Sequence, residues 1–279
     1  MPAHLPTRLD TILATTRACV AAAKKRVPVA ALERQAAAHQ PRGWAAALRR
    51  QAAAGPAVIA EIKRASPSKG LIREDFDGSW LAGRYHAGGA AALSVLTDEP
   101  YFQGSLRNLE LASAAVPLPC LRKDFIVDEY QIVEARAHCG DAILLIAAAL
   151  TDGELKRFAQ TARSLDLDVL VEVHTAEELD RALSTLGLDT QGGASADAIG
   201  VNNRNLKTFE VSLETSLALV ERIPAGVVRV AESGIATAED LMRLREAGFD
   251  AFLIGESLMR QTDPGAALAA LLADATVLP

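Results

Sequence analysis

Residues 138–146 read HCGDAILLI, a helical stretch that ends near a glycine and turns within two residues into an apolar run. The same unit recurs at residues 86–96 (HAGGAAALSVL) and 246–254 (EAGFDAFLI). A glycine suits the left-handed conformation that often follows a helix. The run after it is apolar on both faces, as a strand buried inside a parallel sheet requires. We therefore interpret these stretches as joints between a helix and the next strand of a repeated βα unit.

Eight apolar runs of this kind predict eight strands, most of them starting roughly 25 to 35 residues apart, the size of a βα unit. They are Ala57–Lys63, Ala91–Leu96, Leu118–Lys123, Ala142–Ile146, Asp168–Val173, Ala198–Asn202, Val227–Glu232 and Ala251–Ile254. Helical patterns fill the gaps at Trp80–Ala87, Leu106–Ala115, Glu129–His138, Asp152–Ser164, Ala176–Leu186, Leu213–Ile223, Ala238–Ala247 and Gly265–Ala273. This strict alternation favours a closed α/β barrel, a (β/α)8 TIM barrel, although an open doubly wound sheet also fits the pattern.

Residues 1–55 contain no strand-like run and predict two or three helices, so we expect one barrel domain over residues 1–279 with an N-terminal helical extension at 1–55. Two placements of the extension stay open, namely packing that closes the bottom of the barrel and a cover near its mouth. Residues Ser184 to Asp197 are rich in Gly, Ser, Thr and Asp and predict an inserted surface loop on the stability face of the barrel.

Composition excludes several classes of protein. The net charge is −6, from 29 basic and 35 acidic residues, so the chain offers no basic surface for nucleic acid. The longest apolar run, residues 142–150, is too short to span a bilayer, and no signal peptide is evident. Three widely spaced cysteines argue against a disulfide framework. We expect a cytoplasmic protein that binds a small molecule, and a monomer or weak homo-oligomer.

Ionisable and polar residues recur at the carboxyl ends of the predicted strands, where barrel enzymes place their reacting groups. The catalytic candidates are Glu61, Lys63, Lys123, Glu172 and Asn202. Burying an unpaired charge costs several kcal/mol, so repeated charges at one end of apolar strands favour a functional site. We expect Lys123 to stay protonated as a proton donor, with Glu61 as a candidate to hold it, and we expect desolvation to raise the pKa of Glu172 toward neutrality.

The residues that follow the last two predicted strands indicate a phosphate-binding site. Ser233-Gly234 and Gly255-Glu256 follow the seventh and eighth strands, and small residues there let backbone N–H groups approach an anion. The loop after the first strand, residues 65–71 (ASPSKGL), is suited to folding over a ligand, although an ordinary connection explains it equally well.

The histidines predict no metal site, because they are scattered. His86 and His138 lie near helix ends, and His174 fits a loop position. No Gly-x-Gly-x-x-Gly motif follows a strand, so a dinucleotide cofactor is not indicated. We expect neither a metal nor a cofactor.

The strand ends closely resemble those of the indole-3-glycerol-phosphate synthase family, in the family's order, from about residue 41 to 260. The matching stretches are EIKRASPSKG (61–70), SVLTD (94–98), YFQGS (101–105), LRKDFIVD (121–128), VEV (171–173), GVNNRNL (200–206), AESGI (231–235) and LIGESLM (253–259). The loop at 184–197 is longer than the family pattern suggests, and Glu74 stands where proline is common.

The resemblance implies a carboxy-lyase of tryptophan biosynthesis that converts 1-(2-carboxyphenylamino)-1-deoxyribulose 5-phosphate to indole-3-glycerol phosphate, CO2 and water. It implies that Lys123 is the general acid of ring closure, that Lys63 binds the substrate anions, and that Glu172 acts in the dehydration. It further implies that Glu61 and Asn202 position Lys123 and the sugar hydroxyls. The remaining implied contacts are substrate binding by Ser66, Arg204 and Glu232 and phosphate binding by Ser233, Gly234, Gly255 and Glu256.

Two other functions remain open. A neighbouring phosphate-binding barrel such as phosphoribosylanthranilate isomerase needs a Cys or Asp acid–base pair at the strand ends, whereas here the first strand presents Glu61 and Lys63, and Cys120 lies within the third strand. A non-catalytic barrel that kept its pocket is the second alternative.

Overall fold

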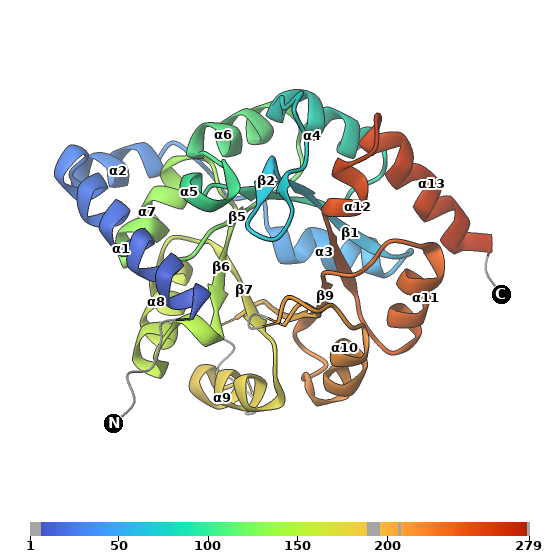
Figure 1. Cartoon of the computed structure of the whole chain (residues 1–279). Coiled ribbons are helices and arrows are strands. Elements are labelled where there is room, and N and C mark those ends of the chain that lie inside the picture. Colours follow the sequence, from blue (N-terminus) through green and yellow to red (C-terminus); the bar gives the residue numbers. More distant parts are fainter. Residues whose placement is uncertain (1–6, 189–195, 206–207, 278–279) are drawn as a thin grey trace.

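Eight parallel strands close into a barrel in the computed structural model, which describes residues 7–188, 196–205 and 208–277 (Figure 1). Around the barrel the order is β1-β10-β9-β8-β7-β6-β5-β4, and β1 pairs with both β10 and β4. The strands are β1 (Ala57–Ile62), β4 (Ala92–Leu96), β5 (Cys120–Lys123), β6 (Ala142–Ile146), β7 (Asp168–Val173), β8 (Ala198–Asn202), β9 (Val228–Glu232) and β10 (Ala251–Ile254). The predicted closed barrel is confirmed.

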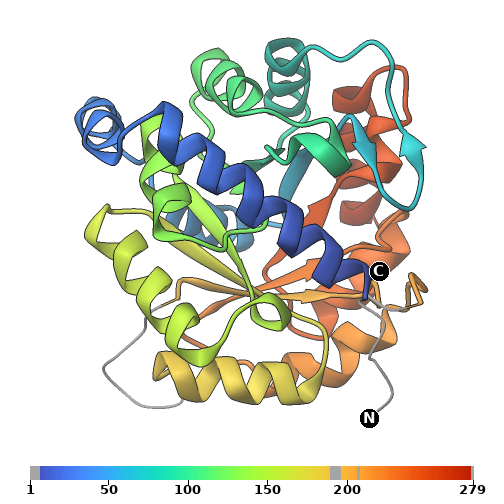
Figure 2. The same ribbon diagram turned by 60° about the vertical axis from the view of Figure 1, so that its left-hand side comes forward.

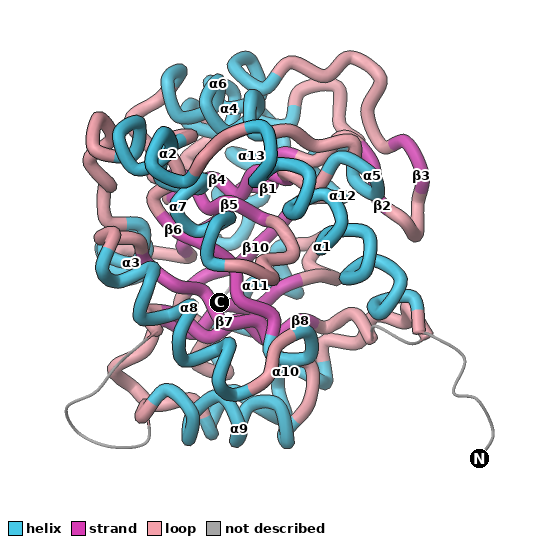
Figure 3. The backbone as a smooth tube through the Cα atoms, turned by 90° about the vertical axis from the view of Figure 1, so that its left-hand side faces the viewer, coloured by secondary structure: helices cyan, strands magenta, loops and turns pink. Residues whose placement is uncertain are grey.

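Helices surround the strands, as the tube in Figure 3 shows. They are α4 (Gly78–Ala87), α6 (Leu106–Ala115), α7 (Glu129–Ala137), α8 (Asp152–Ser164), α9 (Ala176–Leu186), α10 (Glu214–Leu219), α11 (Ala238–Glu246) and α13 (Pro264–Val277). The predicted helix over 213–223 is shorter in the structure and ends in a 3-10 turn at Val220–Arg222. Capping boxes at Thr151 and Thr237 explain the starts of α8 and α11, because each threonine hydroxyl accepts a backbone N–H of the first turn.

Three further elements lie in the loops at the strand ends and were not predicted. The loop after β1 forms a small antiparallel hairpin of β2 (Ala65–Ser66) and β3 (Gly70–Leu71). Single helical turns α5 (Glu99–Phe102) and α12 (Glu256–Met259) follow β4 and β10. Of the predicted surface loop at 184–197, residues 189–195 lie outside the described part of the chain.

The joint at residues 138–146 differs in one detail from the prediction. The left-handed residue is Cys139 (φ 66°) and not Gly140, whereas Gly89 and Gly248 do have positive φ in the other two joints. A Cβ at Gly140 would lie 2.9 Å from the carbonyl oxygen of Ala135. This glycine is therefore needed for a close approach of two backbone segments and not for its conformational freedom.

Side chains alternate along each strand between the barrel interior and the helix layer. On β1, Ala57 and Ile59 pack inside with residues such as Leu170 and Leu253, whereas Val58 and Ile62 belong to the outer cluster under the helices. Because strand side chains alternate with a period of two, Glu61 and then Lys63 continue the inner row toward the carboxyl end. The apolar interior thus ends in charged side chains at one end of the barrel.

The N-terminal extension reaches both ends of the barrel. Helix α3 (Trp44–Ala52) closes the bottom, where Trp44 is fully buried against the first residues of the strands and the N–H of Ala45 donates to Asp168. Helix α2 (Val29–Ala36) packs against α7, and α1 (Arg8–Arg26) runs across the front of the barrel in Figure 2. Both placements left open by the sequence are therefore correct, for different helices.

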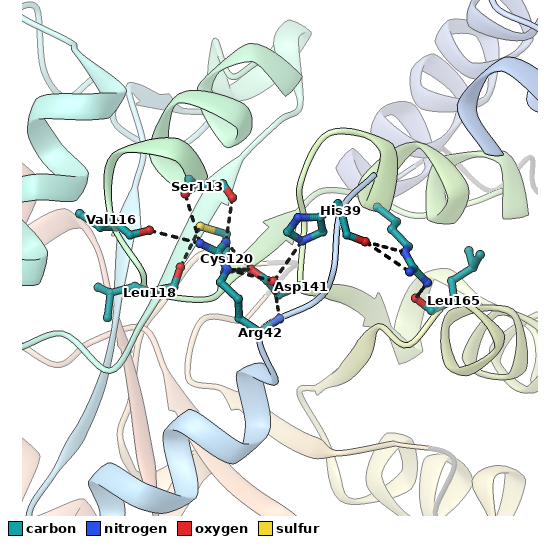
Figure 4. Close-up of polar contacts among 9 residues, drawn as sticks. His39, Arg42, Ser113, Val116, Leu118, Cys120, Asp141 and Leu165 are labelled. Carbon is teal, nitrogen blue, oxygen red and sulfur yellow. Dashed lines mark hydrogen bonds and ion pairs between the residues drawn. The ribbon is translucent and has the colours of Figure 1, made fainter. Parts of the chain in front are cut away.

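A buried ion pair fastens this extension to the barrel floor (Figure 4). Asp141, which directly precedes β6 and is fully buried, accepts hydrogen bonds from Arg42 (N, 2.8 Å; Nη2, 2.5 Å) and from the backbone N–H of Cys120 (2.6 Å). His39 Nε2 lies 3.1 Å from the same carboxylate, and Arg42 also donates to Ser113.

No helix in the described ranges has the length and apolarity to cross a bilayer.

Candidate active site

A cavity of about 710 Å³ opens at the carboxyl ends of the barrel strands. All twelve candidate residues from the sequence line it: Glu61, Lys63, Ser66, Lys123, Glu172, Asn202, Arg204, Glu232, Ser233, Gly234, Gly255 and Glu256. They come from segments spread over almost 200 residues of the chain. Parallel strands bring them together because all the strands end on the same rim.

Lys63 and Glu61 form an ion pair on one side of this cavity. Both side chains are largely buried, with 16% and 5% of their surface exposed. The sequence had suggested that Glu61 holds Lys123. In the structure, Glu61 instead forms its ion pair with Lys63, which directly follows β1 and lies two residues further along the chain.

Lys123 lies at the end of β5 among acidic side chains. Its Nζ is 3.4 Å from Glu172 Oε2 and 4.0 Å from Glu232 Oε2. Desolvation alone would lower the pKa of Lys123, but the charges of Glu172, Glu232 and Glu61 outweigh it and raise that pKa above its usual value. Lys123 is therefore a protonated, partly enclosed ammonium that can donate a proton.

Glu172 and Glu232 form a coupled carboxyl pair beside Lys123. Burial would raise the pKa of Glu172, but Lys123 and His174 lower it well below its usual value, so the expected rise is wrong. Burial and the neighbouring charge of Glu172 instead raise the pKa of Glu232. Among the described residues, Glu232 Oε1 has no hydrogen-bond donor, which also favours the neutral acid. Glu172 is thus the more acidic carboxyl of the two, and Glu232 the less acidic one.

Two glycines make room for the carboxyl groups. A Cβ at Gly200 on β8 would overlap Glu232 Oε1, and a Cβ at Gly255 would lie 2.5 Å from Glu61 Oε1. Both carboxyl groups occupy the space that a side chain would otherwise take. Gly255 was predicted only to bind phosphate, and Gly200 had no separate predicted role.

His174 is a site residue that sequence reasoning assigned to an ordinary loop. Its side chain is only 7% exposed, and its Nε2 lies 3.3 Å from Glu172 Oε1. Burial would lower the pKa of His174, but Glu172 and Glu178 raise it to about 10. The available signal was its position two residues after Glu172, on the same side of the extended chain.

The turn after β9 has the backbone expected of an anion-binding loop. Ser233 and Gly234 both have positive φ, 67° and 83°, and follow Glu232 directly. Asn203, which is 2% exposed and had no predicted role, donates to the Ser233 carbonyl (3.0 Å) and accepts from Ser216 N–H (3.0 Å). Asn203 therefore holds this turn in place from the neighbouring strand end.

Cationic side chains gather next to that turn, around Glu256. Glu256 lies 3.6 Å from Lys69, 3.8 Å from Arg204 and 3.1 Å from Arg260. Desolvation by burial would raise the pKa of Glu256, but the hydrogen bond from Arg260 and the surrounding cations lower it. These contacts hold the Glu256 carboxylate against the cations. Asn202 faces the same region, and its Oδ1 accepts the Arg204 N–H at 3.0 Å.

The opposite wall of the cavity is apolar and was not predicted. Phe102 on α5 and Phe125 after β5 lie with their ring centroids 6.3 Å apart, and Ile146, Leu9 and Ile12 extend this wall. Asp98 caps α5 and thereby places Phe102. A flat hydrophobic group would fit here.

Arg8 of α1 joins two loops at the rim. It donates to the Pro67 carbonyl oxygen at 2.6 Å, in the loop after β1, and its guanidinium lies 5.0 Å from the Phe209 ring centre, after β8. Ser66, in the same loop, is 9% exposed and faces the cavity. The loop at 65–71 thus borders the site and is tied to the N-terminal extension.

Comparisons with known proteins match this architecture. The family model described as indole-3-glycerol phosphate synthase matches residues 9–271. The indole-3-glycerol phosphate synthase of Koribacter versatilis is 56% identical over 264 residues, which is 95% of this chain and 98% of that protein. That of Albidiferax ferrireducens is 52% identical and covers 96% and 98% of the two chains. A thiamine phosphate pyrophosphorylase structure from Pyrococcus furiosus shares only the fold (TM-score 0.58, 15% identity, 79% of this chain and 95% of that one).

Proposed function

The chain belongs to the indole-3-glycerol phosphate synthase family, a family of decarboxylating lyases of tryptophan biosynthesis, and we propose that the cavity at its barrel mouth is where the indole ring closes. The substrate is 1-(2-carboxyphenylamino)-1-deoxyribulose 5-phosphate, and the products are indole-3-glycerol phosphate, CO2 and water. The observation that carries the proposal is the meeting of Lys63, Lys123 and Glu172 in one cavity.

The cavity matches the three parts of this substrate. The apolar wall of Phe102 and Phe125 suits the aromatic ring. The turn at Ser233 and Gly234, together with the backbone of Gly255 and Glu256, suits the phosphate. The charged floor between them lies where the ribulose carbonyl and hydroxyls would sit.

Lys123 is the proposed acid for ring closure. The aromatic carbon that bears the carboxylate attacks the ribulose carbonyl carbon, and the carbonyl oxygen becomes negative as the C–C bond forms. The ammonium of Lys123 gives that oxygen a proton. Loss of CO2 then returns its bonding electrons to the ring. A positioned acid of this kind typically contributes about 10²- to 10⁴-fold in rate.

Glu172 is the proposed base of the dehydration that follows. The hydroxyl takes a proton from the ammonium of Lys63 and departs as water, and the ionised carboxylate of Glu172 accepts the proton that the ring of the cyclised intermediate loses. Lys63 binds the substrate anions and shares in these proton transfers, and Glu61 positions it through their ion pair. Asn202 and neutral Glu232 are left to contact the sugar hydroxyls.

Substrate anions are held by a second group of side chains. Arg204 and Ser66 line the same cavity near the loops after β8 and β1. Lys69 and Arg260, which the sequence analysis did not name, add positive charge next to the phosphate turn. The global charge of −6 makes such local cations necessary for binding a phosphate ester.

Every step in this scheme is a proton transfer or a bond rearrangement within the substrate, so we propose no metal or cofactor. We also propose a cytoplasmic location, because the cysteines Cys19, Cys120 and Cys139 are all free. We propose a monomer or weak homo-oligomer, because few large apolar side chains in the described ranges are exposed, namely Val27, Val29, Leu71, Trp80 and Val211.

The isomerase alternative has little support at this site. Cys120 is fully buried in the outer cluster under the helices, and burial raises its pKa to about 12. It is therefore not placed to exchange protons with a ligand in the cavity.

The test is an assay of the purified protein with the carboxyphenylamino ribulose phosphate, followed by indole fluorescence without added metal or cofactor. Formation of indole-3-glycerol phosphate supports the proposal. Folded protein that releases no indole product would refute it, and phosphoribosylanthranilate supplied separately would reveal the isomerase activity.

A further inference from the structure

His174 lies behind Glu172, on the side of that carboxylate away from the cavity. Its Nε2 is 3.3 Å from Glu172 Oε1, and its Nδ1 is 3.1 Å from Glu178 Oε2 on α9. We propose that His174 is a positioning residue that orients Glu172 and, through the charge of its ring, keeps Glu172 ionised while Glu232 carries the proton of the pair. This inference rests on the proposed function for the role of Glu172, and it deepens it.

The charge state of the ring follows from its neighbours. Each ring nitrogen faces a carboxylate oxygen, and an ionised carboxylate can only accept hydrogen bonds. Nδ1 is hydrogen-bonded to Glu178, whereas Nε2 contacts Glu172 as an ion pair without hydrogen-bond geometry. The two neighbouring carboxylates together favour a hydrogen on both nitrogens, which makes the ring an imidazolium. The pKa of about 10 agrees with this geometry.

Glu178 holds the ring in its orientation. Its Oε2 accepts from both the backbone N–H of His174 (2.7 Å) and ring Nδ1. The N–H of Glu178 is itself bonded to the side chain of Thr175, the N-cap of α9 (3.2 Å). The first turn of α9 thus fixes the imidazolium, which lies in ion-pair contact with one oxygen of Glu172.

The two carboxyls of the coupled pair face different charges. Glu172 has a cation at each oxygen, His174 at Oε1 and Lys123 at Oε2. Of the described cations, Glu232 pairs with Lys123 alone, at 4.0 Å, and Glu61 lies near it. Among the described residues, His174 is the one cation that pairs with Glu172 and not with Glu232, so it decides which of the two carboxyls holds the proton.

The consequence for catalysis is the identity of the base. An ionised Glu172 can accept a proton in the dehydration, whereas a protonated Glu172 cannot. Without the imidazolium, the proton would be divided between Glu172 and Glu232, and the active ionisation state would form only at higher pH. His174 therefore acts through Glu172, without touching the substrate.

The decisive variant is His174→Gln, which keeps an N–H donor toward Glu172 and removes the charge. We expect kcat to fall and the acidic limb of its pH profile to move upward by about 1 pH unit or more, since a lost opposite charge shifts a carboxyl by that amount. KM should stay within about twofold, because His174, unlike Glu172, is not among the described residues that line the cavity. The matched control is His138→Gln, which removes a histidine paired with Glu110 at 2.8 Å on the outside of the barrel. Its profile should coincide with that of the unmodified protein.

A second measurement does not depend on the catalytic activity of the variant. NMR titration of the imidazole nitrogens in the unmodified protein, with the His174 signal identified by its loss in His174→Gln or by sequential assignment, should show a charged ring up to at least pH 8. A neutral His174 at pH 7, or a pH profile unchanged in His174→Gln, would overturn this inference. An unmodified protein without synthase activity would instead overturn the proposed function, whatever the NMR titration shows.

Discussion

Lys123 Nζ lies 3.4 Å from Glu172 Oε2, although 49 residues separate the two in the chain. Each comes from the carboxyl end of a different strand, β5 or β7, and β6 lies between these strands in the barrel. The contact puts a proton donor and a proton acceptor in one cavity. The contact also keeps both side chains charged, because the ammonium lowers the pKa of the carboxyl and the carboxylate raises the pKa of the lysine.

Replacing Lys123 with methionine should remove the acid and keep much of the side-chain volume. We expect kcat to fall by about 10²- to 10⁴-fold, measured by indole fluorescence under saturating substrate. Lys156→Met, on the exposed face of α8, is the control and should retain full activity. A loss smaller than tenfold in Lys123→Met would mean that another group, such as Lys63, supplies the proton.

Replacing Glu232 with glutamine should change how stability depends on pH. The folded pKa of Glu232 is raised, so the stability tied to its protonated form is present below the unfolded pKa and is lost as pH rises through the folded value. Glutamine cannot ionise and escapes this loss. We expect the Tm of Glu232→Gln, relative to the unmodified protein, to rise between pH 5 and pH 9 by at least about 2–4 °C.

The control for that measurement is Glu239→Gln on the exposed face of α11. Its Tm difference from the unmodified protein should stay nearly constant over the same pH range. If the Glu232→Gln difference is equally constant, Glu232 is ionised in the folded protein and the proton assignment is wrong.

Replacing Gly200 with alanine should disturb Glu232 directly, because the new Cβ overlaps Oε1 and comes within 3.2 Å of Leu170. We expect unfolding free energy to fall by about 1–3 kcal/mol, together with a loss of activity. In a Glu232→Ala background the same change should cost less, which a double-mutant cycle by urea denaturation would show. Gly83→Ala, in the middle of α4 with nothing within 4 Å, should instead stabilise the protein by about 0.5–1 kcal/mol.

Replacing Asp141 with asparagine should loosen the extension from the barrel floor without touching the site. Burial would raise the pKa of Asp141, but the hydrogen bonds from His39 and Arg42 outweigh burial and lower it. The ionised Asp141 therefore stabilises the fold above the pKa that it has in the unfolded chain, and this stabilisation is lost as the pH falls through its pKa in the folded protein. We expect a loss of about 3–5 kcal/mol at pH 7 by urea denaturation, with kcat of the folded protein retained.

Asp166→Asn offers a matched comparison on the surface. Asp166 has a positive φ that asparagine tolerates, and its side chain is 79% exposed beside Arg136. This change should cost less than about 1 kcal/mol.

Because Asp141 links residues before β1 to the barrel, we propose that extension and barrel form one domain. A separate unfolding transition for the extension in Asp141→Asn would support the link, whereas an equal effect of both substitutions would contradict it.

The strands were predictable because the information for them is local. An apolar run of four to six residues after a helix end specifies a buried strand, and β6, β7, β8 and β10 have the bounds expected from that pattern. Convergence of the candidate residues was predictable as well, because parallel strands in a barrel end on one rim. The short elements α5 and α12 were missed, since a single helical turn has too few residues for a periodic pattern.

The pairing of charges was not predictable to the same degree. Glu61 pairs with Lys63 and not with Lys123, and His174 was assigned to a loop although it is buried between two carboxylates. Likewise, no periodicity distinguishes α1, which reaches the mouth, from α3, which closes the bottom. Each of these outcomes depends on side-chain conformations and packing in the folded barrel, which local sequence patterns do not specify.

By itself, the sequence determined the barrel, the set of residues on its rim and the family to which the chain is similar. Only the tertiary structure decided that the surroundings lower the pKa of Glu172 and raise that of Glu232, and that a helix from the N-terminus borders the site. The physical reason is that a strand forms from the preferences of adjacent residues, whereas a proton goes to whichever buried carboxyl has fewer cations within a few ångströms.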